Sequence, residues 1–185
     1  MSSSVCPWWL GYALASPLRR VLQDPAAILY PYVRRAMTVL EPGPGMGFFT
    51  IELAWLVGSE GRVVAIDVQP KMLQALRERA SRAGLAERVE TRLGEQDRLG
   101  TDVLAGKVDF ALAFAMVHEL PDQQRFFEEI HATLKPGAKL LVAEPRMHVN
   151  AAKLEGTKRL AEKAGFRVVG EPKVRWSRTV LLERA

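Results

Sequence analysis

Short runs of apolar residues alternate along this chain with longer segments in which apolar residues recur at helical spacing. The runs show no period-two alternation, as in Arg62 to Asp67 (RVVAID), which is typical of parallel strands covered on both faces. The longer segments carry stripes such as Met72, Leu73 and Leu76 and stop at glycines such as Gly84, which favours amphipathic helices. The pattern therefore predicts a chain that alternates strand and helix.

The predicted elements follow a regular order. Strands are expected at about Met37–Glu41, Arg62–Asp67, Arg88–Leu93, Val108–Phe114, Ala138–Glu144, Phe166–Glu171 and Trp176–Glu183. Helices are expected at about Phe48–Val57, Pro70–Ala83, Asp122–Leu134 and Asn150–Ala164. Five strands alternating with helices, followed by a hairpin, predict an α/β fold: a doubly wound, Rossmann-like sheet of seven strands, mostly parallel with an antiparallel terminal hairpin strand, flanked by helices.

The length of 185 residues suits one domain with a sizeable core. Residues 37–185 are predicted to form that domain. Residues 1–36 are predicted to form a helical, aromatic segment broken by prolines. In this segment Trp8, Trp9, Tyr12, Tyr30 and Tyr32 are interleaved with Arg19, Arg20, Arg34 and Arg35. The segment either covers one edge of the sheet or acts as a lid that contributes to a substrate pocket.

Composition narrows the class of protein. Hydrophobic residues make up 48% and charged residues 25%, so a disordered or membrane protein is disfavoured. The net charge of +5 permits an anionic partner without requiring one. The single cysteine, Cys6, excludes an internal disulfide. The apolar stretch Val5–Ala15 lacks a basic segment before it, so it does not resemble a signal peptide, and we expect a cytoplasmic protein.

The strand predicted at Met37–Glu41 runs into a glycine-rich turn, Glu41-Pro-Gly-Pro-Gly-Met-Gly-Phe48. Glycines at alternate positions let the backbone approach a ligand where side chains would collide. A dinucleotide fingerprint would need its third glycine at position 48, which is Phe48, and a phosphate loop would need a following Gly-Lys-Ser/Thr. The ligand is therefore expected at the carboxyl end of this strand. The turn matches neither the dinucleotide fingerprint nor the phosphate loop.

An acid, Asp67, stands at the tip of the second predicted strand, 20 residues after Gly47. A carboxylate there can accept hydrogen bonds from the two adjacent hydroxyls of a ribose. The alternative is that it stabilises the N-terminus of the helix that Pro70 opens.

The glycine turn resembles the first motif of the class I S-adenosylmethionine-dependent methyltransferases, and Leu134-Lys-Pro-Gly137 before an apolar strand is a second similarity. The resemblance spans Met37 to Glu183. It implies S-adenosyl-L-methionine as cofactor and S-adenosyl-L-homocysteine as product. The cofactor-binding residues that it implies are Glu41, Gly43, Pro44, Gly45, Gly47, Phe48, Asp67, Val68, Gln69, Met72, Gly94, Glu95, Gln96, Phe114 and Ala115. The resemblance also implies an acid that accepts a hydrogen bond from the adenine amino group, and Glu95 and Asp97 are both candidates for it.

Four residues after strands four and five are candidates for chemistry. The expected strand order places strand four beside one and five beside four, so His118, Glu119, Glu144 and His148 form one candidate set. They could supply a general base or contact the substrate. A metal site is the weaker alternative, and no metal is predicted. Purely structural roles are equally compatible with the sequence.

The resemblance implies methyl transfer to a small molecule. The segment after strand four, Ala115-Met-Val-His-Glu119, lacks the Asn/Asp-Pro-Pro-Tyr/Phe of amino-group methyltransferases and the Pro-Cys of cytosine-C5 enzymes. The alternatives are an RNA methyltransferase, suggested by the positive charge, and a catalytically silent regulatory protein that binds S-adenosylmethionine. Neither DNA nor a membrane is an expected partner, and a monomer or homodimer is expected.

Overall fold

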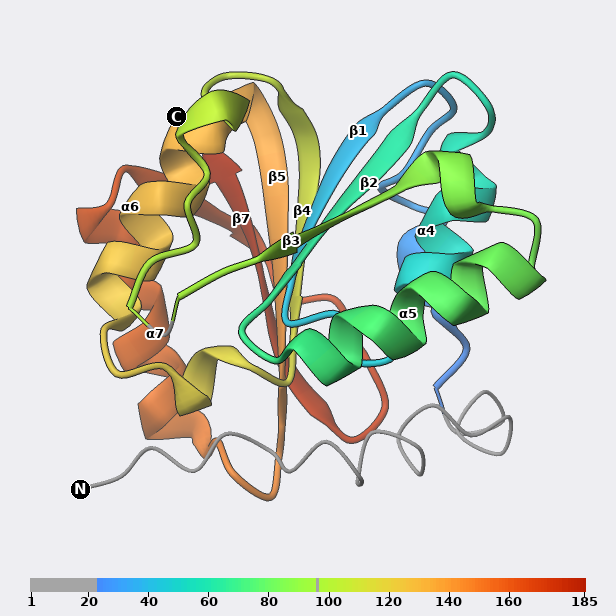
Figure 1. Ribbon diagram of the computed structural model, residues 1–185. Coiled ribbons are helices and arrows are strands. Elements are labelled where there is room, and N and C mark those ends of the chain that lie inside the picture. Colours follow the sequence, from blue (N-terminus) through green and yellow to red (C-terminus); the bar gives the residue numbers. More distant parts are fainter. Residues whose placement is uncertain (1–22, 96) are drawn as a thin grey trace. The chain divides into compact units, whose positions relative to one another are not determined.

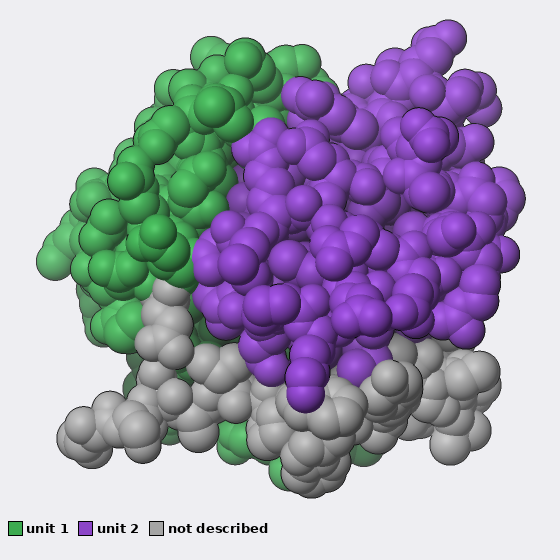
Figure 2. All heavy atoms as spheres, in the orientation of Figure 1, with its two compact units in different colours: residues 1–3, 95–185 green, residues 4–94 purple. Residues whose placement is uncertain are grey.

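The computed structural model describes residues 23–95 and 97–185. They fall into two compact units, shown in Figure 2. Unit 2 holds residues 23–94 of the described chain, and unit 1 holds the described residues from 95 to 185. The predicted boundary between residues 36 and 37 stays a prediction, and most of the aromatic segment before it lies outside the described residues.

Unit 2 contains three parallel strands in the order β3-β2-β1. Its elements are α3 (Pro25–Leu29), β1 (Thr38–Pro42), α4 (Thr50–Val57), β2 (Arg62–Asp67), α5 (Pro70–Arg82), the short 3₁₀ helix η1 (Ala86–Arg88) and β3 (Val89–Leu93). In β2, every residue after Arg62 is buried, as expected for a strand with a neighbour on each side. The apolar run therefore predicted both the bounds and the central position of β2.

The two longer helices of unit 2 connect its parallel strands and pack on them. Helix α4 follows β1, helix α5 follows β2, and both lie on the same side of these strands in Figure 1. This is the arrangement that successive right-handed crossovers produce. Helix α5 begins at Pro70, whose missing N–H costs nothing at a first helical position, and Gly84 follows its end with φ +68°. Its buried face consists of Met72, Leu73, Leu76 and Ala80, as predicted.

Unit 1 contains four strands in the order β4-β5-β7-β6. Its elements are η2 (Asp102–Leu104), β4 (Val108–Phe114), η3 (Val117–Glu119), α6 (Gln123–Thr133), β5 (Leu134–Pro145), α7 (Ala151–Lys163), β6 (Phe166–Gly170) and β7 (Ser177–Arg184). Strands β4 and β5 are parallel, whereas β7 pairs antiparallel with both β5 and β6. The predicted terminal hairpin and the predicted pairing of strands four and five are both confirmed.

Strand β5 begins earlier than predicted. The sequence suggested a turn at Leu134-Lys-Pro-Gly137 before a strand from Ala138. In the structure Leu134 already pairs with Val108, and the register then shifts so that Lys139 pairs with Phe110. Gly137 adopts φ +75° within the shift. A glycine in the left-handed region and a proline without an N–H are accommodated as a bulge, so the strand is interrupted without being ended.

His131 on α6 is less exposed than the sequence suggested. The sequence places His131 next to Glu128 on the predicted helix Asp122–Leu134, which predicts a solvated surface residue. The ring instead packs edge-on against Phe166, with 5.2 Å between ring centroids, and it lies against Gly165. Burial lowers the pKa of His131. The expectation was wrong because β6 follows α7 back onto this face of α6, a contact that local sequence does not reveal.

None of the described helices has both the length and the apolar character that a membrane span requires.

Candidate functional site

The glycine turn after β1 adopts a left-handed backbone at each of its three glycines. Gly43, Gly45 and Gly47 all have positive φ, at +67°, +55° and +83°. The turn is tied to its neighbours, since Gly43 N–H donates to Ile66 O (2.8 Å) and Gly47 N–H donates to Pro44 O (3.0 Å). Three left-handed glycines in five residues keep side chains off one side of the turn, so a ligand can lie directly on the backbone.

Glu41, at the end of β1, is a buried carboxyl group without a full set of partners. Its side chain is only 3% exposed, and no described residue forms a hydrogen bond to Oε2. Burial raises the pKa of Glu41 to about 7; the nearby Thr50 hydroxyl counteracts this shift and the charge of Asp67 adds to it. An acceptor that is both buried and unpaired is costly, so a donor or cation from a ligand would stabilise it.

Asp67, at the end of β2, lies beside the glycine turn. Its Oδ2 accepts a hydrogen bond from Gly45 N–H (3.3 Å) and its Oδ1 accepts one from Gln69 N–H (2.9 Å). The carboxylate therefore fixes the turn and the entry into α5 together. Neighbouring Val68 and Gln69 are half-buried, and Met72 is buried.

The remaining residues assigned to the cofactor are spread along the chain. Pro44 and Phe48 are buried in unit 2, and Phe48 packs edge-on against Phe49 with ring centroids 5.1 Å apart. Gly94, Phe114 and Ala115 are half-buried and Glu95 is exposed, whereas Gln96 lies outside the described residues. Of the two competing acids, Asp97 lies 3.7 Å from Arg125 Nη1 in a solvent-exposed ion pair of unit 1. The competition between Glu95 and Asp97 for adenine stays open.

Two glycines of the turn should respond differently to alanine. At Gly47 a Cβ would collide with Cδ1 of the fully buried Leu76, and φ is unfavourable, so we expect Gly47→Ala to cost about 2–4 kcal/mol of stability. At Gly45 no atom of the described residues lies within 4 Å of an added Cβ, apart from the glycine itself and its two chain neighbours. We expect Gly45→Ala to cost only about 1 kcal/mol while it weakens binding of S-adenosylhomocysteine more than tenfold, because its methyl group occupies ligand space.

Thermal melts and titration calorimetry separate the two effects. Wild-type affinity in a folded Gly45→Ala protein would contradict a ligand lying on this turn. Gly100→Ala is the matched control, because Gly100 also has a positive φ (+69°) and no described atom near an added Cβ, but it belongs to unit 1 and not to the turn.

A second cluster forms in unit 1, where β4 and β5 end. The register pairs Phe114 with Ala143, so Glu144 follows beside the segment after β4. Glu144 is 1% exposed, and its carboxylate accepts hydrogen bonds from the N–H groups of Met116 (3.3 Å), Val117 (3.0 Å) and His118 (3.4 Å). Three backbone donors converging on one carboxylate form an anion-binding nest.

The imidazole of His118 is a further hydrogen-bonding partner of the Glu144 carboxylate. Its Nδ1 lies against Glu144 Oε2 in a short contact. The hydrogen bond to Glu144 raises the pKa of His118, and burial and Lys153 partly oppose that shift. Glu119 Oε1 lies 3.9 Å from the other ring nitrogen, Nε2. His148 is exposed and stacks on His118, with ring centroids 5.1 Å apart and planes at 12°. All four predicted candidates therefore meet in one cluster.

Some contributors were not singled out from the sequence. Thr50, which is buried and whose hydroxyl has no partner among the described residues, lies near Glu41. Arg79 reaches Met46 O with Nη1 (3.5 Å) and so links α5 to the glycine turn. Ala115 was assigned to the cofactor from the sequence, but its φ of +57°, which is rare for alanine and turns the chain into the nest around Glu144, was not foreseen. Only the backbone conformation or a long-range contact reveals each of these roles.

An open cavity of about 680 Å³ lies next to the end of β5. Its lining residues are Arg146, Met147, Arg175 and Trp176. Within the described residues there is no group of three or more metal-ligating side chains that could hold a metal ion. The predicted absence of a metal stays a prediction.

Known proteins resemble this chain along most of its length. A family profile described as "Methyltransferase domain" matches residues 34–174. The arsenite methyltransferase of Halobacterium salinarum is 34% identical over 107 residues, which are 58% of this chain and 27% of that protein. The ubiquinone/menaquinone biosynthesis C-methyltransferase UbiE of Klebsiella pneumoniae is 30% identical over 112 residues, 60% of this chain and 44% of that protein. The chain thus spans less than half the length of these curated relatives.

Solved structures agree with the sequence matches. The crystal structure of a SAM dependent methyltransferase from Aquifex aeolicus has a TM-score of 0.87 and 28% identity, and the match covers 98% of this chain and 100% of that one. The predicted fold class is confirmed by this similarity and by the seven strands in the two units. The predicted cofactor, S-adenosylmethionine, is the one that this family uses. The chain belongs to the methyltransferase domain family, the class I S-adenosylmethionine-dependent methyltransferases.

Proposed function

We propose that this protein transfers a methyl group from S-adenosylmethionine to a small-molecule acceptor. The observation that carries the proposal is the buried Glu41 carboxyl group, whose Oε2 has no hydrogen-bond partner among the described residues, beside a turn of three left-handed glycines. S-adenosylmethionine supplies, when bound, a methyl group on a sulfonium, which is an activated leaving group.

The residues of unit 2 fit this cofactor. It carries a cationic amino group, and Glu41 is a buried acceptor that a cation would stabilise. Open space above Gly45 admits a ligand against the backbone. Asp67 would accept hydrogen bonds from ribose hydroxyls, as acids at this strand position do in nucleotide-binding folds. Charge, space and acceptor groups therefore agree with one ligand.

Two observations support a small-molecule acceptor: the names of the related methyltransferases and the local contacts of Arg34. Relatives include an arsenite methyltransferase and a quinone C-methyltransferase, both named for small acceptors. An RNA methyltransferase would be expected to present Arg19, Arg20, Arg34 and Arg35 on one face, but Arg19 and Arg20 lie outside the described residues. Arg34 Nη1 donates to Tyr30 O (2.7 Å) and Val33 O (3.0 Å), so its guanidinium caps a local turn. This contact favours a structural role for Arg34 over contact with a phosphate.

The test follows the methyl group. The protein is incubated with methyl-labelled S-adenosylmethionine and a cell extract, and the extract is then separated into small molecules, RNA and protein. We expect label among the small molecules, in an amount that Asp67→Ala abolishes and the exposed-site control Asp102→Ala leaves unchanged. Label in RNA, with binding that weakens steeply as salt rises, would support the RNA alternative instead. Binding of S-adenosylhomocysteine without label in any fraction would support the silent regulatory protein.

A further inference from the structure

We propose that His118 is the general base of this methyltransferase, that Glu144 is its positioning residue, and that the acceptor is therefore a protic group, an O–H or an N–H. This inference rests on the proposed function and assigns separate roles to four residues that the sequence left as one set.

Glu144 cannot itself serve as the base. The carboxylate is 1% exposed, and its two oxygens already face three backbone N–H groups and the imidazole of His118. Several donors on a carboxylate stabilise its charged form and leave little capacity for an incoming proton. The same contacts hold η3 against the end of β5. Glu144 therefore acts through His118 and not on the acceptor.

The carboxylate also decides which imidazole nitrogen carries the proton. Because Glu144 Oε2 lies against Nδ1, the neutral ring carries its hydrogen there, and the lone pair lies on Nε2. Nε2 has no hydrogen bond from a described residue, and the nearest acid, Glu119, is 3.9 Å away. The His118 side chain retains 18% exposure, so a small acceptor can reach it. A carboxylate behind an imidazole whose far nitrogen is accessible is the arrangement of a base.

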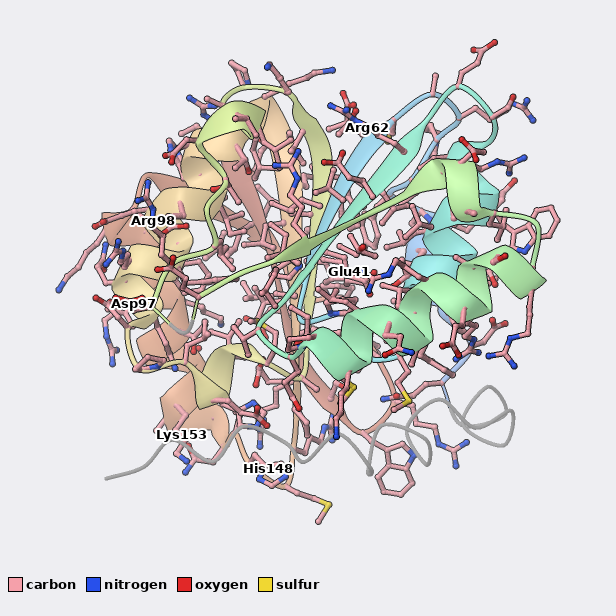
Figure 3. The ribbon with its side chains drawn as sticks, in the orientation of Figure 1. Glu41, Arg62, Asp97, Arg98, His148 and Lys153 are labelled. Atoms are coloured by element: carbon pink, nitrogen blue, oxygen red, sulfur yellow. The ribbon has the colours of Figure 1, made fainter. Side chains whose placement is uncertain are left out.

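The charged and titratable groups around His118 act in both directions. Glu144 and Glu119 favour the protonated ring, whereas Lys153 opposes it. His148 stacks on the ring. Lys153 Nζ donates to His148 O (3.0 Å), and both residues lie where β5 leads into α7, as Figure 3 shows. Lys153 thus modulates the base without replacing it.

The proposed step balances. Nε2 of His118 removes the proton from the acceptor's O–H or N–H, and the electron pair left on that atom forms the new bond to the methyl carbon. The methyl–sulfur bond breaks with its pair remaining on sulfur, so the sulfonium becomes a neutral thioether. The imidazolium afterwards releases the proton to water.

The first experiment needs no acceptor. Side-chain ¹⁵N NMR of the three histidines, assigned with His131→Gln and His148→Gln, reports the tautomer and titration of His118 in the full chain. We expect the Nδ1–H tautomer and a pKa above the usual range, which falls in Glu144→Gln but not in the exposed control Glu155→Gln. Glutamine keeps an acceptor for the backbone donors, so the variant should fold. A hydrogen on Nε2 in the neutral ring would overturn the proposal.

The second experiment measures catalysis with defined probes, a phenol and a primary amine. We expect His118→Gln to lower kcat by about 10²–10⁴-fold while the affinity for S-adenosylhomocysteine stays within twofold. The rate should rise with pH through the pKa of His118, and Glu144→Gln should move that rise to lower pH. A pH-independent rate, or a His118→Gln variant with more than a tenth of wild-type kcat, would overturn the assignment of His118 as the general base. Loss of S-adenosylhomocysteine binding by the wild type would instead overturn the proposed function. Should neither probe be methylated, the NMR tautomer decides.

Discussion

Replacing Glu41 with glutamine is expected to stabilise the free protein at high pH and to weaken its binding of S-adenosylhomocysteine. In the unfolded chain this acid titrates near 4.5, whereas burial raises the pKa in the folded protein to about 7. As the pH rises from 4.5 to 7, the unfolded state loses its proton first, so this group's contribution to stability falls. Above pH 7 the loss is constant, at about 3 kcal/mol for a shift of that size.

Glutamine removes the charge but leaves a buried amide, which itself costs roughly 1–2 kcal/mol. We therefore expect Glu41→Gln to gain about 1–2 kcal/mol at pH 8, or about 2–8 °C in Tm, and to lose about 1–2 kcal/mol at pH 4, where the acid is already neutral and only the cost of the buried amide remains. Thermal melts across this pH range check the result, with the exposed Glu60→Gln as the matched control. Equal effects at pH 4 and pH 8 would show that the charge of Glu41 is not what costs stability.

Binding of the ligand should change in the opposite direction. A cationic group beside Glu41 favours its ionised form, so binding at pH 7 should release about half a proton from a carboxyl that is half-protonated in the free protein. Calorimetry in two buffers of different ionisation enthalpy measures that release. In Glu41→Gln we expect the release to disappear and the affinity to fall about 10–100-fold, the value of one charged hydrogen bond.

Replacing Asp67 with alanine is expected to reduce affinity for S-adenosylhomocysteine about 100-fold. Two charge-assisted hydrogen bonds to a ribose contribute about 3 kcal/mol together. The variant also loses the acceptor for Gly45 N–H and Gln69 N–H, so the glycine turn is less well fixed. Calorimetric titration of the purified variant measures the affinity.

A second substitution separates contact with the ligand from support of the turn. Asp67→Asn keeps an acceptor for Gln69 N–H but removes the charge, and we expect an intermediate loss of about tenfold. Asp102→Ala, an exposed acid paired with Arg98, is the matched control and should bind as the wild type does. If Asp67→Ala unfolds while Asp67→Asn binds like the wild type, Asp67 is a structural residue and not a ribose ligand.

Particular elements show how far the sequence could be interpreted. The bounds of β2 and β4 were predicted to the residue, because each is a largely apolar run: charged residues stand at both ends of β2, and Lys107 precedes β4. Helix starts were also readable, since Asp122 and Asn150 accept from Arg125 N–H and Lys153 N–H as N-caps. The bulge at Lys135-Pro-Gly137 was interpreted as a turn, because glycine and proline are common in turns and in β-bulges alike.

At the candidate sites, too, the sequence predicted some features and left others to the structure. The alternate glycines predicted a turn whose backbone a ligand can approach, and an acid at the tip of each of the first two strands predicted its two carboxylates. The roles of Glu144 and His118 were not separable, because the sequence places them 26 residues apart and says nothing of burial.

What the sequence determined by itself was the order of elements, the glycine turn and the family, because period, turn chemistry and local spacing act over a few residues. Tertiary structure alone decided that Glu41 is buried without a full set of partners, that Glu144 is enclosed by three backbone N–H groups, and that His131 packs on Phe166. Burial and pKa depend on which distant segments exclude water from a side chain. That exclusion exists only when strands far apart in the chain have paired.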